Sequence, residues 1–307
     1  MKHGFQTTLA DRVEISGLGV HSAAPARIIL HPSDPDSGIS FLRTGLPGGR
    51  ERLVEAKWSN IRQTSLCTVI GDTTGATIAT VEHLMAALSG LRIDNCMIEI
   101  DGPETPIMDG SAAQFVEAID SVGLVTQSRR RRYLKIVRPV YAENGRARAE
   151  LRPAASGFRI DVSIDFDALV IGRQRRAFDI EPQTFRKELA RARTFGFMHE
   201  VESMRSHGLG LGGNLENAVV IDDEYVLNPG GLRFPDEFVR HKILDAIGDL
   251  YIVGHPLIAA FSGFKSGHAL NNALLRKLLE TPSAWEFVSF SEVADAPSSF
   301  HRLPVTA

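Results

Sequence analysis

The alternation of apolar and polar residues along the chain predicts two successive runs of strands and helices. In the first run, alternating segments at 26–32, 37–43 and 95–102 are typical of half-buried strands, and segments at 81–89 and 112–123 have helical periodicity. The second run has the same kinds of element, with strands expected at 133–142, 146–153 and 158–166 and helices at 181–193 and 241–250. We therefore expect an α+β fold built from two similar two-layer sandwich domains, residues 1–128 and 129–307.

The predicted helix at 241–250 has chemistry on one face. His241, Asp245 and Asp249 are four residues apart, so they return to the same side of a helix, and Lys242 lies about 60° from Asp245 at about 100° per residue. The opposite arc is apolar, which allows that side to pack. Pro235 suits the first helical turn. A His/Asp pair at this spacing is also compatible with an ordinary solvated face, so a metal site requires a further ligand from elsewhere.

A second segment, residues 80–90, predicts a short helix with Thr80 as N-cap and Gly90 after its end. Glu82 and His83 then lie in the first turn. The positive end of the helix dipole stabilises an anionic Glu82 and keeps His83 neutral, which is the state a metal requires. Alone, the pair is compatible with simple capping electrostatics.

Taken together, His83, His241 and Asp245 supply two imidazoles and one carboxylate, a ligand set suited to zinc. Three protein ligands leave a fourth position for water, whose pKa a catalytic zinc lowers to about 7. Glu82 is the natural base for that water. A structural zinc in a non-enzymatic protein is the alternative, and the open position with an adjacent glutamate argues against it.

Six segments, in this order, closely resemble the UDP-3-O-acyl-N-acetylglucosamine deacetylase family of lipid A biosynthesis. The resemblance covers nearly the whole chain. The segments are TVEHLMAAL (80–88), PIMDGSA (106–112), RARTFGFM (191–198), LENAVV (215–220), LRFPDEFVRHKILDAIGDL (232–250) and KSGHALNN (265–272).

The resemblance implies that the two sandwich domains face each other with the active site between them. It also implies a zinc-dependent hydrolase that removes an N-acetyl group and releases acetate. His83, His241 and Asp245 would hold the zinc and Glu82 would deprotonate the attacking water. His268 would act as the second catalytic group, stabilising the oxyanion as a cation and protonating the leaving nitrogen. A loop histidine that caps a turn is the alternative for His268. A zinc amidohydrolase acting on another acylated sugar or on a peptide is the alternative activity.

Further roles come from the same resemblance. Asp249 would favour the charged form of His268, Thr194 would donate a hydrogen bond to the oxyanion, and Lys242 would reach the same cavity. Phe166, Phe197 and Lys265 would contact the uridine diphosphate, although Phe166 also fits a core position at the end of strand 158–166. Substrate contacts are also implied for Phe195, Gly213, Ala218 and Val220.

Residues 198–230 resemble the insert that forms the acyl passage in this family. Residues 218–227 predict two strands around an acidic turn, whose inward face could line a hydrocarbon chain. The upstream GLGLGG at 208–213 satisfies a dinucleotide-binding pattern, but it lacks the preceding apolar strand and the following helix. We therefore reject a nucleotide-cofactor site there.

Composition narrows the remaining choices. The 307 residues are 43% hydrophobic and 23% charged with a net charge of −3, which gives no general attraction to nucleic acid. The basic run 129–132 is interpreted as a solvated strand entry or linker. Cys67 and Cys96 form no disulfide framework, which fits a reducing cytoplasm, and Cys67 is expected to be a small buried thiol. No apolar stretch is long enough for a membrane span. We expect a cytoplasmic monomer acting on a small amphipathic substrate, an acylated UDP-glucosamine.

Overall fold

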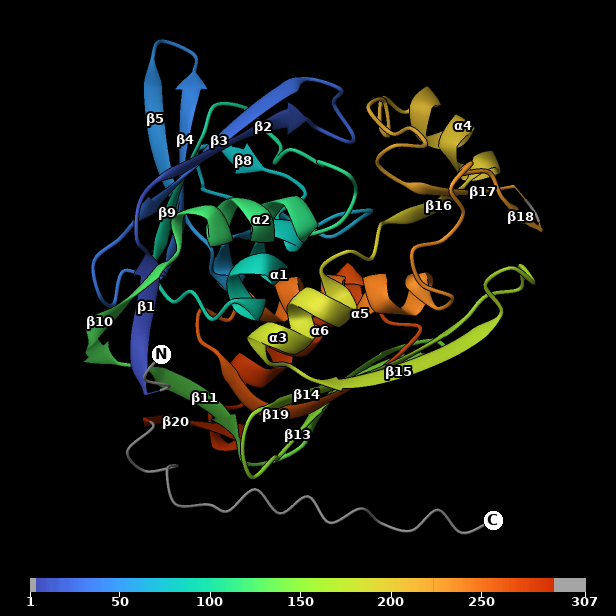
Figure 1. Ribbon diagram of the computed structural model, residues 1–307. Coiled ribbons are helices and arrows are strands. Elements are labelled where there is room, and N and C mark those ends of the chain that lie inside the picture. Colours follow the sequence, from blue (N-terminus) through green and yellow to red (C-terminus); the bar gives the residue numbers. More distant parts are fainter. Residues whose placement is uncertain (1–3, 223, 290–307) are drawn as a thin grey trace, which may run out of the picture.

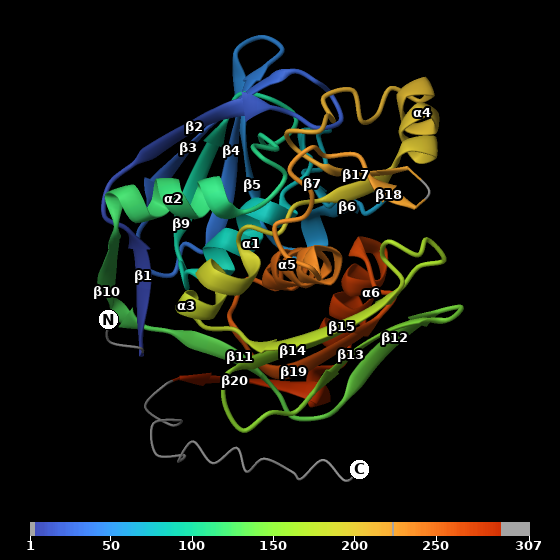
Figure 2. The same cartoon turned by 45° about the vertical axis from the view of Figure 1, so that its right-hand side comes forward.

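The computed structural model describes residues 4–222 and 224–289. Two large sheets form the outer layers, and the main helices lie between them in two layers that face each other (Figures 1 and 2). The expected α+β architecture of two facing sandwiches is therefore confirmed. Among the described residues, no helix has the length and apolar character needed to cross a bilayer.

The first sheet has the strand order β2-β3-β9-β4-β5. Its alternation follows the sequence, since Ala26, Ile28 and Leu30 of β3 are buried while their neighbours are more exposed. β4 and β9 are parallel and the other neighbours are antiparallel. A parallel pair needs a long crossover, and this crossover carries helix α1. The strands are β2 (Val13–Leu18), β3 (Pro25–Pro32), β4 (Ile39–Leu46), β5 (Arg50–Glu55) and β9 (Cys96–Ile100).

The second sheet has the order β12-β13-β19-β11-β20, with β14 pairing β19 and β15 pairing β14. β19 is central because it pairs with β11, β13 and β14. Ile160, Val162 and Ile164 of β14 are buried, as their alternation predicts. The strands are β11 (Arg132–Ile136), β12 (Val140–Asn144), β13 (Ala147–Arg152), β14 (Phe158–Asp165), β15 (Arg173–Asp179), β19 (Leu257–Phe264) and β20 (Trp285–Ser289).

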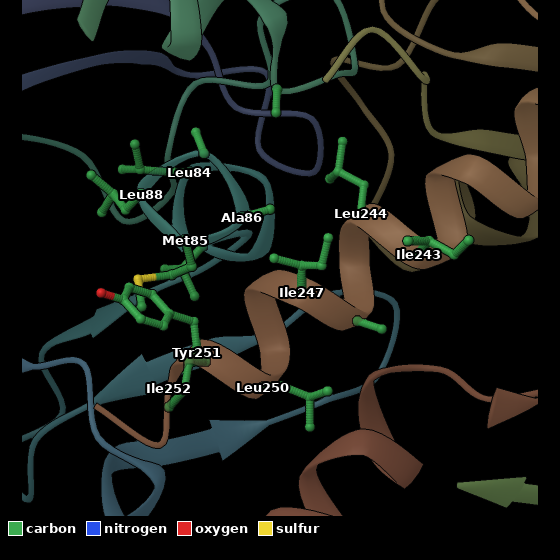
Figure 3. Packing of buried hydrophobic residues seen from close by; sticks show 14 of the residues in the cluster. Leu84, Met85, Ala86, Leu88, Ile243, Leu244, Ile247, Leu250, Tyr251 and Ile252 are labelled. Atoms are coloured by element: carbon green, nitrogen blue, oxygen red, sulfur yellow. The ribbon is translucent and has the colours of Figure 1, made fainter. Parts of the chain in front are cut away.

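The two sandwiches meet through helices α1 and α5, whose apolar side chains pack together (Figure 3). Met85 of α1 and Leu244 and Ile247 of α5 are at most 1% exposed, and burying one such side chain contributes about 1.5–3 kcal/mol. The helices of these layers are α1 (Glu82–Gly90), α2 (Ala113–Val122), α3 (Pro182–Thr184) with the π turn η2 (Phe185–Leu189), α5 (Glu237–Tyr251) and α6 (His268–Leu279).

Smaller elements surround this frame. β1 (Phe5–Leu9) pairs with β10 (Leu124–Arg130). The predicted insert contributes α4, β17 and β18, and β17 pairs with the preceding β16 in a small three-stranded sheet (Figure 1). β17 and β18 are antiparallel, which confirms the two strands predicted within 218–227. The remaining elements are η1 (Trp58–Asn60), β6 (Ile61–Gln63), β7 (Val69–Gly71), β8 (Thr77–Ile78), β16 (Phe195–Phe197), α4 (Met198–Ser206), β17 (Val219–Asp222), β18 (Tyr225–Val226) and η3 (Pro282–Ala284).

The expected start and end of helix 81–89 are wrong. Thr80 has a left-handed backbone (φ +58°) and donates its hydroxyl to Glu104 Oε1 at 3.0 Å, so Val81 occupies the N-cap position instead. Gly90 is the last residue of the helix rather than the residue after it. A Cβ at Gly90 would lie 2.3 Å from the ring of Phe185, so this glycine is required by close packing.

Two predicted elements of the second half are divided. The strand expected at 133–142 breaks between β11 and β12, where Pro139 has no N–H to donate to a ladder. The helix expected at 181–193 ends at Leu189, after a π turn in which Ala190 N–H donates to Phe185 O. Tertiary bonds replace the regular pattern at both places.

The basic run 129–132 is an exposed strand entry, as expected, except that Arg131 is deeply buried. Arg130 ends β10 and Arg132 begins β11. Arg131 is 3% exposed and its Nη2 lies 2.6 Å from Asp94 Oδ2. The same nitrogen donates to Arg92 O at 2.9 Å. This pair ties the start of the second half to the loop after α1, a role that a basic run by itself does not reveal.

Candidate active site

Helices α1 and α5 bring three potential metal ligands together from opposite halves of the chain. His83 lies in the first turn of α1, whereas His241 and Asp245 lie one turn apart on α5. Asp245 Oδ1 is 3.2 Å from His241 Nε2 and 3.6 Å from His83 Nε2. One ligand atom from each residue lies within 4.8 Å of the others, and all three side chains are buried. The sequence separated these residues by about half the chain, and the fold joins them.

The surroundings of His241 and Asp245 fit a bound cation. His241 Nδ1 lies 3.0 Å from Ala192 O, which places its proton on Nδ1 and leaves the Nε2 lone pair free. Asp245 Oδ1 is buried without a hydrogen-bond partner among the described residues. A buried carboxylate oxygen is costly when unpaired, and a divalent ion between it and two imidazoles would compensate that cost. The chemistry of the three donors therefore suits a divalent metal.

Electrostatics keep His241 and Asp245 in the protonation states that a metal requires. Burial lowers the pKa of His241 to about 4, with the neighbouring His83 and Lys242 acting in the same direction. Burial alone would raise the pKa of Asp245, but the nearby histidines and Lys242 lower it below its ordinary value. At neutral pH, His241 is therefore neutral and Asp245 is ionised, as metal ligands must be.

Glu82 and His268 face each other beside the ligand set. Glu82, the first residue of α1, is 3% exposed, and burial raises its pKa against the opposing effect of His268. His268 begins α6, and its Nε2 lies 3.7 Å from Glu82 Oε1. Its Nδ1 lies 2.9 Å from Asp249 Oδ2. Although burial disfavours the cation, Asp249 and Glu82 raise the pKa of His268 to about 10. Glu82 is therefore a stronger base than an exposed carboxylate, and His268 is a protonated imidazole.

Thr194 and Lys242 also lie at this site. Thr194 borders the cavity and is fixed by its backbone, which donates to Gly110 O at 2.8 Å and accepts from Val219 N at 2.8 Å. Gly110 has φ +82°, and a Cβ there would lie 2.0 Å from Asn217 O, which explains the glycine in PIMDGSA. Lys242 Nζ lies 3.7 Å from Asp245 Oδ2.

A cavity of about 380 Å³ opens over these groups. Its polar end contains the candidate ligands, Glu82 and His268, and its other end runs under the insert. Phe195, Gly213, Ala218 and Val220, all expected to contact substrate, line it. The insert contributes apolar side chains to the lining, together with Glu200, Arg205 and Asn214; the apolar ones are Met198, Val201, Met204 and Leu215. The candidate catalytic groups thus share one cavity with apolar side chains of the insert.

Comparison with known proteins identifies the family. Residues 6–280 match the model of the LpxC family, described as UDP-3-O-acyl N-acetylglycosamine deacetylase. Three relatives with the name UDP-3-O-acyl-N-acetylglucosamine deacetylase cover nearly all of both chains: that of Chromobacterium violaceum is 53% identical over 302 residues (98% of each chain), that of Neisseria meningitidis serogroup A 49% over 303 residues (98% of each), and that of Shewanella halifaxensis 48% over 298 residues (96% of each). The chain belongs to this deacetylase family. It is therefore an enzyme that hydrolyses an amide, as the resemblance of its motifs implied.

A second hollow of this family member lies beside the insert and contains aromatic rings. Phe166 and Phe197 both line it, with ring centroids 6.1 Å apart, and His199 stacks on Phe197 at 5.4 Å. Phe166 is thus at the edge of a hollow and also packs against the core, so both interpretations of it describe part of its environment. Lys265 borders neither hollow among the described residues, and its Nζ pairs with Asp165 Oδ2 at 3.2 Å.

Sequence reasoning missed two residues that this deacetylase places around Asp249. Thr68 Oγ1 donates to Asp249 Oδ1 at 2.7 Å, and Asn271 Nδ2 donates to Oδ2 at 2.9 Å. Asn271 is three residues after His268 on α6, so helical spacing could have found it. Thr68 lies in a loop without periodicity. Its neighbour Cys67 is buried, as expected, and also lines the cavity, and burial raises the pKa of its thiol to about 12.

Proposed function

We propose that this chain removes the N-acetyl group from UDP-3-O-acyl-N-acetylglucosamine, an early step of lipid A biosynthesis, with zinc as its metal. The observation that carries the proposal is the convergence of His83, His241 and Asp245 with Glu82 and His268 at the polar end of one cavity. Family membership supports the reaction, and the donor set supports the metal.

His83, His241 and Asp245 would hold the ion. When bound, zinc supplies a Lewis acid that polarises the amide carbonyl and lowers the pKa of a water molecule. The chain's own contribution is a buried ligand set in which His241 is neutral and Asp245 is ionised. Ala192 O orients His241, because this oxygen accepts the Nδ1–H of the ring and so fixes the ring tautomer.

Glu82 is the proposed general base. Its carboxylate takes a proton from the water whose oxygen attacks the acetyl carbon, forming a C–O bond. Burial raises the pKa of Glu82, which makes it a stronger base than an exposed carboxylate. Thr68 N–H holds Glu82 Oε2 at 3.1 Å, so the carboxylate keeps one orientation.

His268 is the proposed general acid. Its Nδ1–H donates to Asp249, so Nε2 carries the proton that faces Glu82 and the cavity. As the C–N bond breaks, that proton passes to the glucosamine nitrogen, and acetate and the free amine leave. Before this transfer, the cation and the Thr194 hydroxyl stabilise the oxyanion, and Lys242 adds positive charge nearby.

The two hollows suit the two ends of an acylated nucleotide sugar. We assign the apolar passage under the insert, including Ala218 and Val220, to the acyl chain, with Gly213 and Phe195 beside it. We assign the aromatic hollow of Phe166 and Phe197 to uridine. We assign Lys265 to the diphosphate, for which its ammonium group would leave its ion pair with Asp165. Free Cys67 and Cys96 support a reducing compartment, and we propose the cytoplasm.

The test is mass spectrometry of acetate release from UDP-3-O-acyl-N-acetylglucosamine, with metal content measured in the same samples. We expect release that requires the acyl chain and stops on chelation, while the chain stays folded. Glu82→Gln should retain the metal and lower turnover by about 10²- to 10⁴-fold. No acetate from the metal-loaded chain would refute the reaction, and unchanged turnover in Glu82→Gln would remove Glu82 from its role.

A further inference from the structure

Thr68 contacts both sides of the proposed proton-transfer machinery. It lies just before β7, and its backbone is tied to the start of α1: its N–H donates to Glu82 Oε2 at 3.1 Å, and its carbonyl accepts from Val81 N at 3.3 Å. Its side-chain hydroxyl points away from α1 and donates to Asp249 Oδ1 at 2.7 Å. Thr68 is 2% exposed, so water does not compete for these bonds.

The carboxylate of Asp249 receives donors from both halves of the chain. Asn271 Nδ2 and His268 Nδ1, both on α6, lie 2.9 Å from Oδ2. Oδ1 lies 3.1 Å from His268 Nδ1 and receives its shorter bond from Thr68, which belongs to the other half of the chain, 181 residues away. With donors on both oxygens, the plane of the carboxylate is fixed. Without the Thr68 hydroxyl, Asp249 keeps its donors from α6. It loses the hydrogen bond that fixes its orientation relative to α1, where Glu82 lies.

We propose that Thr68 is a positioning residue that sets the placement of the His268–Asp249 pair relative to Glu82. This rests on the proposed function, in which the base and the acid act on one substrate. Catalysis depends on holding such groups to within about 0.5 Å, and misplacement by about 1 Å costs roughly 10²-fold in rate. Thr68 does not line the cavity, and its hydrogen bonds reach Glu82, Val81 and Asp249, so its effect should reach turnover without altering substrate binding.

The informative substitution is Thr68→Val, which keeps the shape and the backbone N–H to Glu82 but removes the hydroxyl. We expect kcat to fall by about 10- to 100-fold with KM and bound zinc nearly unchanged. Thr68→Ser, which restores the hydroxyl, should recover kcat to within about threefold of the original. If Thr68→Val does not fold, Thr68→Ala removes the same hydroxyl without adding the second methyl group of valine. It should show the same loss of kcat.

The matched control is Thr8→Val. Thr8 is 4% exposed, and its hydroxyl donates to Asn95 O at 2.7 Å and accepts from Ser33 N–H at 3.0 Å. The substitution therefore removes an equally buried and equally short donor bond away from the site, together with one accepted bond. We expect a similar loss of stability from Thr8→Val with unchanged kcat. An equal fall of kcat in Thr8→Val and Thr68→Val would overturn the proposal, because the effect would then be general.

Two further measurements separate positioning from a purely structural role. In an Asp249→Asn background, Thr68→Val should lower kcat by less than about threefold, because the carboxylate that Thr68 orients is no longer present. The ¹H–¹⁵N resonance of His268 Nδ1 should shift in Thr68→Val and return in Thr68→Ser. An unshifted resonance together with unchanged kcat would refute the inference. Because the resonance needs no substrate, it tests Thr68 even if the chain releases no acetate, a result that would refute the proposed function alone.

Discussion

Replacing Gly248 with alanine should separate the two halves of the active site. Gly248 lies on α5 between Asp245 and Asp249 and faces the backbone of α1. A Cβ there would lie 2.0 Å from Glu82 O and 3.1 Å from Ala86 N. Both obstacles are backbone atoms of a helix, so no flexible side chain can move aside. The strain therefore falls on the distance between α1, which carries His83, and α5, which carries the other two ligands.

The size of the effect follows from these distances. Cβ atoms essentially never approach a heavy atom closer than 3.0 Å, so α1 and α5 must move apart by at least 1.0 Å (3.0 − 2.0) at this point. Overpacking of this kind costs about 1–3 kcal/mol, and the higher helix propensity of alanine offsets about 1 kcal/mol of it. Net destabilisation is thus about 0–2 kcal/mol. Metal sites tolerate errors of only about 0.2 Å, so metal affinity and turnover should suffer more than stability.

The assay measures three quantities on Gly248→Ala: zinc affinity by competition with a chelator, kcat for acetate release, and urea unfolding of the metal-free chain. We expect kcat to fall by about 10²-fold and zinc affinity by at least tenfold, with the small loss of stability given above. Gly230→Ala is the control, since a Cβ there meets no atom within 4 Å. Wild-type zinc affinity and kcat in Gly248→Ala would refute the argument that this contact sets the site.

Two further predictions concern stability. Burial, assisted by Arg132, lowers the pKa of His255 from its ordinary value of 6.5 to about 4, so the unfolded chain takes up this proton first. The free energy of unfolding should therefore fall as pH decreases from about 6.5 to about 4. His255→Leu should flatten that pH dependence, measured by urea unfolding at several pH values. An equal slope of unfolding free energy against pH in the variant and the wild type would contradict the prediction. Arg131→Met leaves Asp94 without its buried partner and should cost about 3–5 kcal/mol, whereas adding Asp94→Leu should restore part of this loss; no recovery would argue against the pair as the cause.

Much of the fold could be predicted because its signals are local. The four-residue spacing of His241, Asp245 and Asp249 in an apolar pattern predicts α5, and alternation predicts β3 and β14. Errors occurred where distant contacts replaced local preference. Thr80 bonds to Glu104 instead of capping α1, and the bonds of Arg131 to the loop after α1 make part of the basic run internal.

The sequence by itself determined the element types, the chemistry of the candidate ligands and, through its motifs, the family. It could not show that His83 and His241 meet, because helical and strand periodicities report which face a residue lies on and not which element packs against that face. Only the tertiary structure decided this, through the close contact of α1 with α5 at Gly248. The same reason hides Thr68, whose bonds to Glu82 and Asp249 exist only after the two halves of the chain have packed together.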